Sequence, residues 1–251
     1  MSGHSKWSTI KRRKGVQDAK RGQLFTRLAR EITIAAREGG GDVNSNFSLR
    51  IAVDRARSES MPKDNIERAI KRGTGEDKGS TQIDQVTYEA YAPHGIALLI
   101  ECLTENRNRT IAELRHILTH GGGSIGEVGS VSWQFNRIAY FAIPAEGVDY
   151  DKVFEYAVEG GADDIVQDED TIEIFAPVEV FKKISDMLAE AKIKVAEAGI
   201  RMVPKQDITL DTNQTLKVMR VIEELEDLAD VQNVYSNLRI GEDALTALET
   251  V

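Results

Sequence analysis

The chain of 251 residues has little cysteine and no long apolar run. Its single cysteine, Cys102, cannot form an internal disulfide and cannot supply a metal site built from several thiolates. Because Cys102 lies in an apolar segment with no base beside it in sequence, we expect a core position rather than a nucleophile. The longest apolar run, 95–103, has the length of a strand and not the roughly 20 residues of a bilayer span. A soluble protein in a reduced compartment is expected.

Motifs of the common enzyme classes are also missing. The chain has no nucleophile elbow, no H-E-x-x-H and no P-loop lysine. The run 121–126 matches G-x-G-x-x-G in letters, but we expect a helix before it and a strand after it, the reverse of a dinucleotide site. We interpret it as a turn or contact loop. Glu113, His116 and His120 share a helical face without ligands from a facing helix, so we expect surface histidines, no metal and no cofactor.

The net charge of −9 is distributed very unevenly along the chain. Residues 1–75 hold 17 basic and 8 acidic side chains, whereas the remaining 176 residues hold 15 basic and 33 acidic ones. Residues 1–30 alone carry 9 basic side chains and one acid, Asp18. A merely solvated surface ordinarily mixes the two signs, so this asymmetry indicates a polyanion-binding arm joined to an acidic body.

The hydrophobic period divides the chain. Residues 1–21 have only scattered apolar side chains and read as a basic arm, after which 22–80 show a helical period. Within that stretch Gly39 should stop the first helix, Asn46 should cap the second, and Pro62 and Gly73 should bound the third. The polar stretch 73–81 reads as a linker. We therefore expect a three-helix domain first.

Beyond the linker the chain alternates strands and helices, which predicts an α+β protein. A capping box at 110–113 should open one helix, and others should cover 149–159, 178–191 and 216–225. Strands are expected at 86–91, 95–103, 131–135, 138–143, 165–167, 171–175, within 193–203 and at 231–238.

Two groups of residues are candidates for contact with a nucleic acid. Trp7 offers a flat face for base stacking or, as readily, an anchor on the helical domain. In the arm the cations that can follow a phosphate backbone are Lys6, Lys11, Arg12, Arg13, Lys14, Lys20 and Arg21. The second group, Arg107 and Arg109 with two asparagines beside them, precedes an expected helix N-terminus, an anion-receptive position. A capped turn with solvated arginines is the equally good alternative.

Several segments resemble the YebC family, which includes the mitochondrial translational activator of cytochrome c oxidase. The resemblance spans essentially the whole chain. Besides Tyr88-Glu89 and Pro93-His94-Gly95, it is carried by G-H-S-K-W at 3–7, Q-D-A-K-R at 17–21, M-P-K-D-N-I-E-R-A-I at 61–70, N-R-N-R-T at 106–110, G-S-V-S-W-Q-F at 129–135 and L-A-D-V-Q-N-V-Y at 228–235.

The resemblance implies a helical N-terminal domain followed by two ferredoxin-like α+β domains, the last inserted into the second. The expected domains are a basic arm at 1–21, a helical domain at 22–80, an α+β domain at 81–136 plus 205–251, and an inserted α+β domain at 137–204. Family members are described as DNA-binding transcriptional regulators or as translation factors acting on the ribosome. The nucleic-acid-binding residues expected on this basis are His4, Ser5, Lys6, Trp7, Lys11, Arg12, Arg13, Lys14, Lys20, Arg21, Arg27, Arg30, Arg107 and Arg109.

We therefore expect a non-enzymatic, nucleic-acid-binding regulator of gene expression whose partner is DNA or ribosomal RNA. An acidic body would be repelled by a long duplex, whereas an arm with Trp7 and His4 suits irregular RNA, which favours the ribosome slightly. One alternative is an acidic protein-interaction module with the arm as a tether, and the less favoured one is a nucleotide-processing enzyme using the 121–126 loop. Because the family-like motif begins at Met1, we expect no presequence and a bacterial cytoplasmic location. The oligomeric state is open, with a monomer slightly favoured.

Overall fold

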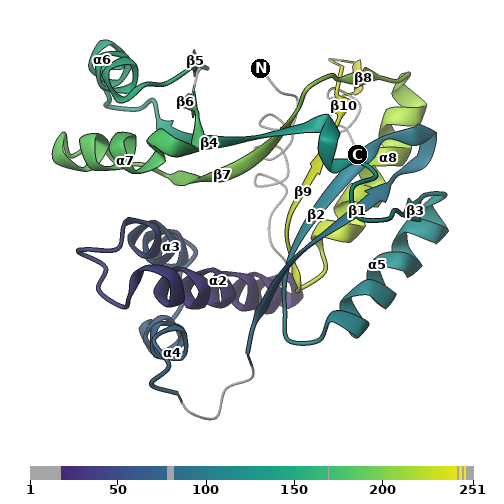
Figure 1. Ribbon diagram of the computed structural model, residues 1–251, viewed down its shortest axis with the longest axis horizontal. Helices are drawn as coiled ribbons and strands as arrows, with labels where there is room; N and C mark the ends of the chain where they lie inside the picture. The colour runs from purple at the N-terminus through teal and green to yellow at the C-terminus, as the bar shows by residue number, and fades with distance from the viewer. Residues whose placement is uncertain (1–17, 78–81, 169, 242, 245, 247–251) are drawn as a thin grey trace. The chain divides into compact units, whose positions relative to one another are not determined.

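The computed structural model describes residues 18–77, 82–168, 170–241, 243, 244 and 246, with the backbone alone for 18–20 (Figure 1). The chain divides into two compact units. The first unit consists of Met1–Arg27, Thr81–Asn136 and Val203–Val251, and the second consists of Leu28–Ser80 and Arg137–Met202. Each unit is therefore assembled from segments that are distant in sequence. The domain boundaries given above stay predictions.

The helical part contains α2 (Asp18–Gly39), α3 (Phe47–Ser58) and α4 (Lys63–Gly73). Leu28 and Ile32 of α2 are buried, as the helical period predicts. Asn46 fixes the turn between α2 and α3: its Oδ1 accepts from Leu49 N at 3.0 Å, and its Nδ2 donates to Ala35 O and Gly40 O at 2.8 Å each. The capping asparagine thus serves both helices, because it satisfies backbone groups at the end of one and the start of the next.

The first unit contains an antiparallel sheet in the order β3-β1-β2-β9. Its strands are β1 (Asp84–Tyr91), β2 (Ala97–Thr104), β3 (Ser124–Ile125) and β9 (Val231–Ser236). Helices α5 (Arg107–Gly121) and α8 (Thr212–Glu226) bury Leu114, Leu118, Met219 and Ile222 against Ile100 and its strand neighbours. Cys102, fully buried in β2, belongs to this core as predicted. A short parallel pair joins β8 (Ile208–Thr209) and β10 (Leu238–Arg239).

The second unit contains a sheet in the order β5-β6-β4-β7. Its elements follow the chain as β4 (Phe135–Pro144), α6 (Tyr150–Gly160), β5 (Asp164–Gln167), β6 (Thr171–Ala176), α7 (Phe181–Glu190) and β7 (Glu197–Pro204). This βαββαβ succession, with the first and third strands at the centre, is the ferredoxin-like arrangement. In the first unit the central strands β1 and β2 are instead consecutive, although that sheet is also covered by helices. The α+β class is confirmed.

Two local predictions are wrong. The predicted strand at 131–135 is a short 3-10 helix, Ser132–Gln134, because the side chain of Glu89 binds the backbone N–H groups of Val131 and Ser132 that a strand partner would need. The predicted capping box at 110–113 does not open α5. That helix begins at Arg107 and is capped by Asn106, whose side chain accepts from Arg109 N at 3.1 Å.

Candidate nucleic-acid interface

Most of the predicted arm lies outside the residues that the structure describes. The predicted site residues that are not described are His4, Ser5, Lys6, Trp7, Lys11, Arg12, Arg13 and Lys14. Lys20 lies in α2, and its side chain is not described. The arm's contact with a nucleic acid therefore remains a prediction from the sequence.

The three described arginines of α2 differ in their surroundings. Arg21 is exposed, with its guanidinium carbon 5.6 Å from the centroid of the Phe25 ring. Arg27 donates from Nη1 to Glu226 O at 3.1 Å and from Nη2 to Gln232 O at 3.0 Å. Arg30 is buried, with 8% of its surface exposed. Arg27 is thus engaged with backbone carbonyls and Arg30 is buried, so the interface proposed below does not include them.

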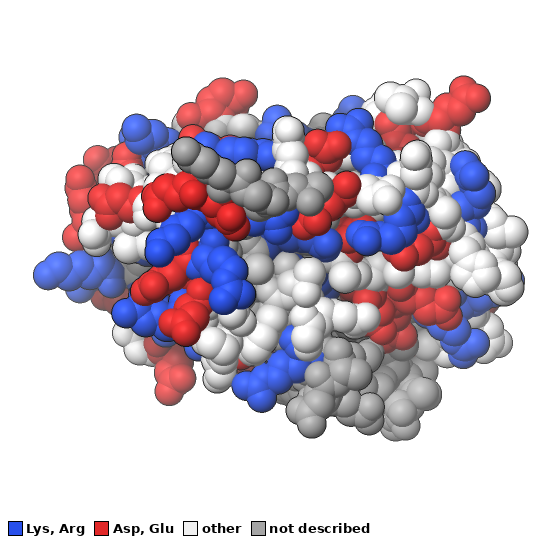
Figure 2. Space-filling model, turned by 90° about the horizontal axis from the view of Figure 1, so that it is seen from below, with Lys and Arg blue, Asp and Glu red and all other residues white. Residues whose placement is uncertain are grey.

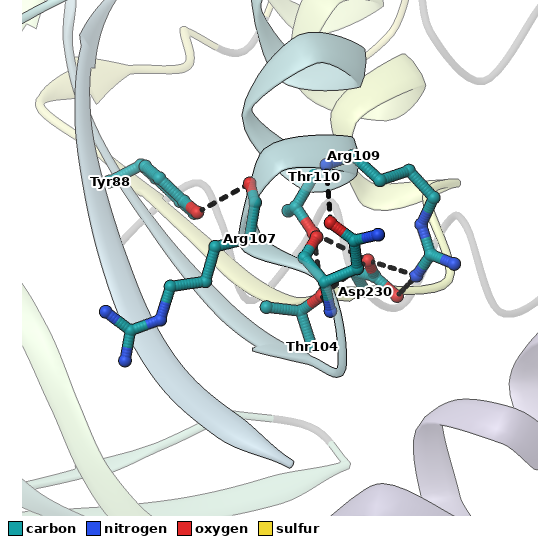
Figure 3. Close-up of polar contacts among 7 residues, drawn as sticks. Tyr88, Thr104, Arg107, Arg109, Thr110 and Asp230 are labelled. Atoms are coloured by element: carbon teal, nitrogen blue, oxygen red, sulfur yellow. Dashed lines mark hydrogen bonds and ion pairs between the residues drawn. The ribbon is translucent and has the colours of Figure 1, made fainter. Parts of the chain in front are cut away.

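A buried carboxylate organises the first turn of α5 (Figure 3). Asp230, just before β9, is 2% exposed. Its Oδ2 accepts from the hydroxyls of Thr104 at 3.0 Å and Thr110 at 2.6 Å. Both of its oxygens accept from Arg109 Nη2, at 2.9 and 2.7 Å. The hydrogen bonds and the negative charge of Asp230 raise the pKa of Arg109. A buried charge that is fully hydrogen-bonded in this way fixes the position of its partners.

Arg107 is held from the opposite side of the same turn. Its Nε lies 2.7 Å from Asp84 Oδ2, and its carbonyl accepts from the Tyr88 hydroxyl at 3.4 Å. Burial raises the pKa of Tyr88, so its hydroxyl stays protonated as a donor. Figure 3 shows the guanidinium groups of Arg107 and Arg109 extending away from each other. The structure thus places both arginines within the first turn of the helix and not ahead of it.

The chemistry of this turn is that of a positioned donor set. Residues 105–109 are exposed, and the helix N-terminus adds its partial positive charge. The Arg109 side chain is half exposed, and no hydrogen bond among the described residues uses its Nε or Nη1. However, Asp84 and Asp230 balance the two guanidinium charges. The turn can therefore direct hydrogen bonds to a phosphate or a base edge, but it cannot supply the main electrostatic attraction.

The glycine-rich run has a packing explanation. A Cβ at Gly121 would collide with Val221, one at Gly123 with the carbonyl of Tyr91, and one at Gly126 with the Ser130 hydroxyl. Gly122 ends α5 in the left-handed conformation, with φ of 87°. The run follows the C-terminus of a helix, where a phosphate meets carbonyl groups instead of N–H donors. This geometry favours the interpretation as a structural turn.

The histidine pair on α5 is exposed, as expected. The rings of His116 and His120 have centroids 4.3 Å apart, and His120 Nδ1 lies 3.2 Å from His116 O. Within the described residues, no group of three or more His, Cys, Asp or Glu side chains could hold a metal ion. The same part of the chain has no helix with the length and apolar character of a membrane span.

The charge asymmetry is strongest at the start of the sequence, in residues 1–30. Figure 2 shows basic and acidic side chains interspersed over the face that it draws. Within α3 and α4 several cations pair with acids: Arg57 lies 3.2 Å from Asp54, and Lys63 lies 3.4 Å from Glu67. Five cations without any acid fall in residues 1–17 of the sequence. The strongest polyanion signal therefore belongs to the arm.

Sequence reasoning missed two buried carboxylates, Asp230 and Glu89. Asp230 hydrogen-bonds side chains more than 100 residues away in the sequence, and no local sequence pattern predicts such a partner. Glu89 stands in an otherwise apolar end of β1, and a charged residue in that setting was the available signal. It is 8% exposed and binds three backbone N–H groups of the segment that follows β3.

Comparison with known proteins agrees with the fold. Residues 5–76 match the N-terminal domain of the TACO1/YebC proteins, and residues 83–238 match their second and third domains. A "probable transcriptional regulatory protein" of Syntrophus aciditrophicus is 46% identical over 99% of both chains. Another with that name, from Chlorobium chlorochromatii, is 48% identical over 99% of both.

A solved structure gives the same result. The crystal structure of a conserved hypothetical protein, Aq1575 from Aquifex aeolicus, is 39% identical and matches with a TM-score of 0.79. The match covers 90% of this chain and 93% of that one. Together with the two family-model matches, which cover most of the sequence, these similarities show that the chain belongs to the TACO1/YebC family.

Proposed function

We propose that this protein is a non-enzymatic regulator of gene expression that binds nucleic acid through its N-terminal arm. The observation that carries the proposal is the excess of cations in residues 1–30, nine against a single acid. Seven of these cations, between Lys6 and Arg21, are available for phosphate contacts, and such contacts release counterions and dominate affinity. The names of the relatives, probable transcriptional regulatory proteins, support a role in gene expression.

We favour RNA over duplex DNA as the ligand, and ribosomal RNA in particular. Beyond residue 75 the chain carries 33 acids against 15 cations, which would repel a long duplex lying along it. Arg107 and Arg109 lie on a fixed, exposed turn, which suits the irregular backbone and exposed base edges of folded RNA. A catalytic role is not part of the proposal, since the glycine run has a packing role.

The test is fluorescence anisotropy with labelled RNA and DNA between about 50 and 200 mM salt. One variant neutralises the arm as Lys11→Gln, Arg12→Gln, Arg13→Gln and Lys14→Gln. The matched control removes four exposed cations elsewhere: Lys152→Gln, Lys182→Gln, Lys194→Gln and Arg220→Gln. Four lost phosphate contacts on a single strand should reduce the slope of log affinity against log salt by about 3. The control should keep the parent's slope.

Two results would count against the proposal. The first is the absence of binding to any RNA or DNA at low salt. The second is an arm variant that binds with the parent's affinity and salt slope. The second result would instead favour an acidic protein-interaction module for which the arm is only a tether.

A further inference from the structure

Trp133 is a large aromatic side chain that the fold exposes instead of burying. Its exposed fraction is 66%, whereas Val131 and Phe135 on either side are almost completely buried. It belongs to the segment 126–133 of the first unit, which we call the Trp133 loop. The loop overlaps the motif G-S-V-S-W-Q-F at 129–135, and the proposed function does not use it. Exposing an indole forfeits the free energy of its burial, so the loop needs a specific explanation.

The side chain of Glu89 fixes the backbone of the loop through hydrogen bonds. Glu89 Oε1 accepts from Gly129 N at 2.7 Å, and Oε2 accepts from Val131 N at 2.6 Å and Ser132 N at 2.9 Å. Gly126 N also donates to Glu89 O at 2.8 Å. Three charge-assisted bonds to one carboxylate fix the backbone on both sides of Ser130. The exposed ring therefore stands on an ordered base.

The edge of the indole ring is already engaged within the loop. Trp133 Nε1 donates to Ser130 O at 3.0 Å, and the same carbonyl accepts from the Tyr91 hydroxyl at 3.0 Å. Because indole has this one donor and no acceptor, only the faces of the ring remain for a ligand. A flat ring with a fixed orientation and free faces is suited to stacking on another flat ring.

The loop has one other exposed apolar side chain, Val128, which is 98% exposed, and the residues next to Trp133 are polar. Ser132 is exposed, Gln134 is partly exposed, and the ammonium of Lys205 lies 2.7 Å from Trp133 O. Lys205 is exposed and keeps two donors beyond that bond. One indole and one valine make a smaller apolar surface than the contiguous patch of a protein-docking site, and the ammonium of Lys205 lies at the backbone carbonyl of Trp133. That pairing matches a nucleobase with its flanking phosphate.

We propose that Trp133 stacks on an unpaired nucleobase of a bound single-stranded nucleic acid, with Lys205 beside the adjoining phosphate. The inference rests on the proposed function and adds a second contact, remote in sequence from the arm. The arm supplies attraction that does not depend on base pairing. The Trp133 loop selects unpaired bases over duplex, because a stacked base pair offers no free face.

The chain has two tryptophans, so a Trp7→Phe variant makes Trp133 the single fluorescent reporter. This full-length variant is titrated with single-stranded RNA, single-stranded DNA and duplex RNA at low salt. Quenching of Trp133 emission by single strands, and not by duplex, is the expected result. RNA and DNA single strands that quench equally indicate recognition of the base alone, and stronger quenching by RNA adds a contact to its sugar.

Affinity for the same strands, carrying a fluorescent label, is measured by anisotropy for the parent, Trp133→Ala and Trp133→Phe. Loss of one stacked base should weaken single-strand binding about tenfold in Trp133→Ala, whereas Trp133→Phe keeps most of the affinity. Phe154→Ala, which removes another exposed aromatic from the second unit, should bind as the parent does. Circular dichroism and thermal unfolding show whether Trp133→Ala keeps its fold, which the exposure of the side chain predicts.

Single-strand binding without quenching, or with undiminished affinity in Trp133→Ala, overturns the inference and leaves the proposed function standing. Emission that changes with intact ribosomes but with no RNA or DNA places a protein against the ring and also overturns it. If the parent binds no nucleic acid at all, the proposed function itself fails.

Discussion

At the scale of single residues, two buried carboxylates fix the surfaces that we connect with function. Asp230 holds Arg109 in the first turn of α5, and Glu89 holds the Trp133 loop. Neither group faces a ligand. Each hydrogen-bonds several donors of an exposed segment, and removing such a partner leaves those donors unsatisfied.

Glu89 gives a prediction for the dependence of stability on pH. Burial opposes its ionisation, but the three backbone N–H donors outweigh burial, so its pKa lies below the ordinary value of 4.5. Its carboxylate therefore contributes stability that is complete above pH 4.5 and is lost as pH falls through the lower, folded-state pKa. Urea unfolding between about pH 3 and pH 7 should show a smaller acid-induced loss in Glu89→Gln than in the parent.

The same comparison gives the cost of the variant at neutral pH. An amide side chain cannot accept all three bonds with charge, so Glu89→Gln should lower the free energy of unfolding by about 2 kcal/mol at pH 7. Glu127 is exposed, so Glu127→Gln is the control. It should change neither the free energy of unfolding at pH 7 nor the acid-induced loss of stability. If the free energy of unfolding changes with pH in the same way for the parent and for Glu89→Gln, the account is contradicted.

At the scale of elements, the helical part depends on a close approach between α2 and α4. A Cβ on Gly73 would collide with the carbonyl of Thr33 and lie 2.7 Å from Ala36 Cβ. Gly22, also in a helix, has no neighbouring atom within 4 Å of the same position. Gly73→Ala should therefore destabilise the protein by roughly 1–3 kcal/mol, by overpacking.

Gly22→Ala is the matched opposite. Its added methyl group meets open space, and alanine is favoured over glycine in a helix by up to about 1 kcal/mol. The Gly22→Ala midpoint in urea should therefore equal or exceed that of the parent, while the Gly73→Ala midpoint falls. Equal destabilisation by the two substitutions would show that the packing of α4 on α2 is not the cause.

Local signals predicted the elements that local chemistry controls. Asn46 caps the second helix as predicted, and the helix predicted at 149–159 is present as Tyr150–Gly160. The failures came where distant partners decide. Thr110 looks like an N-cap, but its hydroxyl binds Asp230, and Asn106, four residues earlier, caps the helix instead. Residues 131–135 look like a strand, but Glu89 occupies their N–H groups.

The candidate site likewise has features that the sequence predicts and features that depend on distant partners. The cation-rich arm was visible as composition, since charge summed along the chain needs no fold. The exposure of Trp133 was not visible, because an aromatic among apolar neighbours ordinarily packs inward. The burial of Arg30 and the backbone bonds of Arg27 were equally hidden, since they depend on which part of α2 meets other elements.

At the scale of the whole molecule, opposite charges are segregated along one chain. The N-terminal region is cationic and the rest is acidic, with net charges of +9 up to residue 75 and −18 beyond it. In the proposed function the arm attracts a polyanion, and the acidic body limits how much of that polyanion can lie alongside. The arginine turn and the Trp133 loop, both in the first unit, are the proposed sites of directed contacts.

The most direct test of this account is cross-linking in cells, followed by sequencing of the RNA and DNA bound to the protein. The parent should yield cross-links concentrated in ribosomal RNA, and replacing the four cations from Lys11 to Lys14 with glutamine should remove most of them. If the variant gives the same cross-links to RNA and DNA as the parent, the account is contradicted.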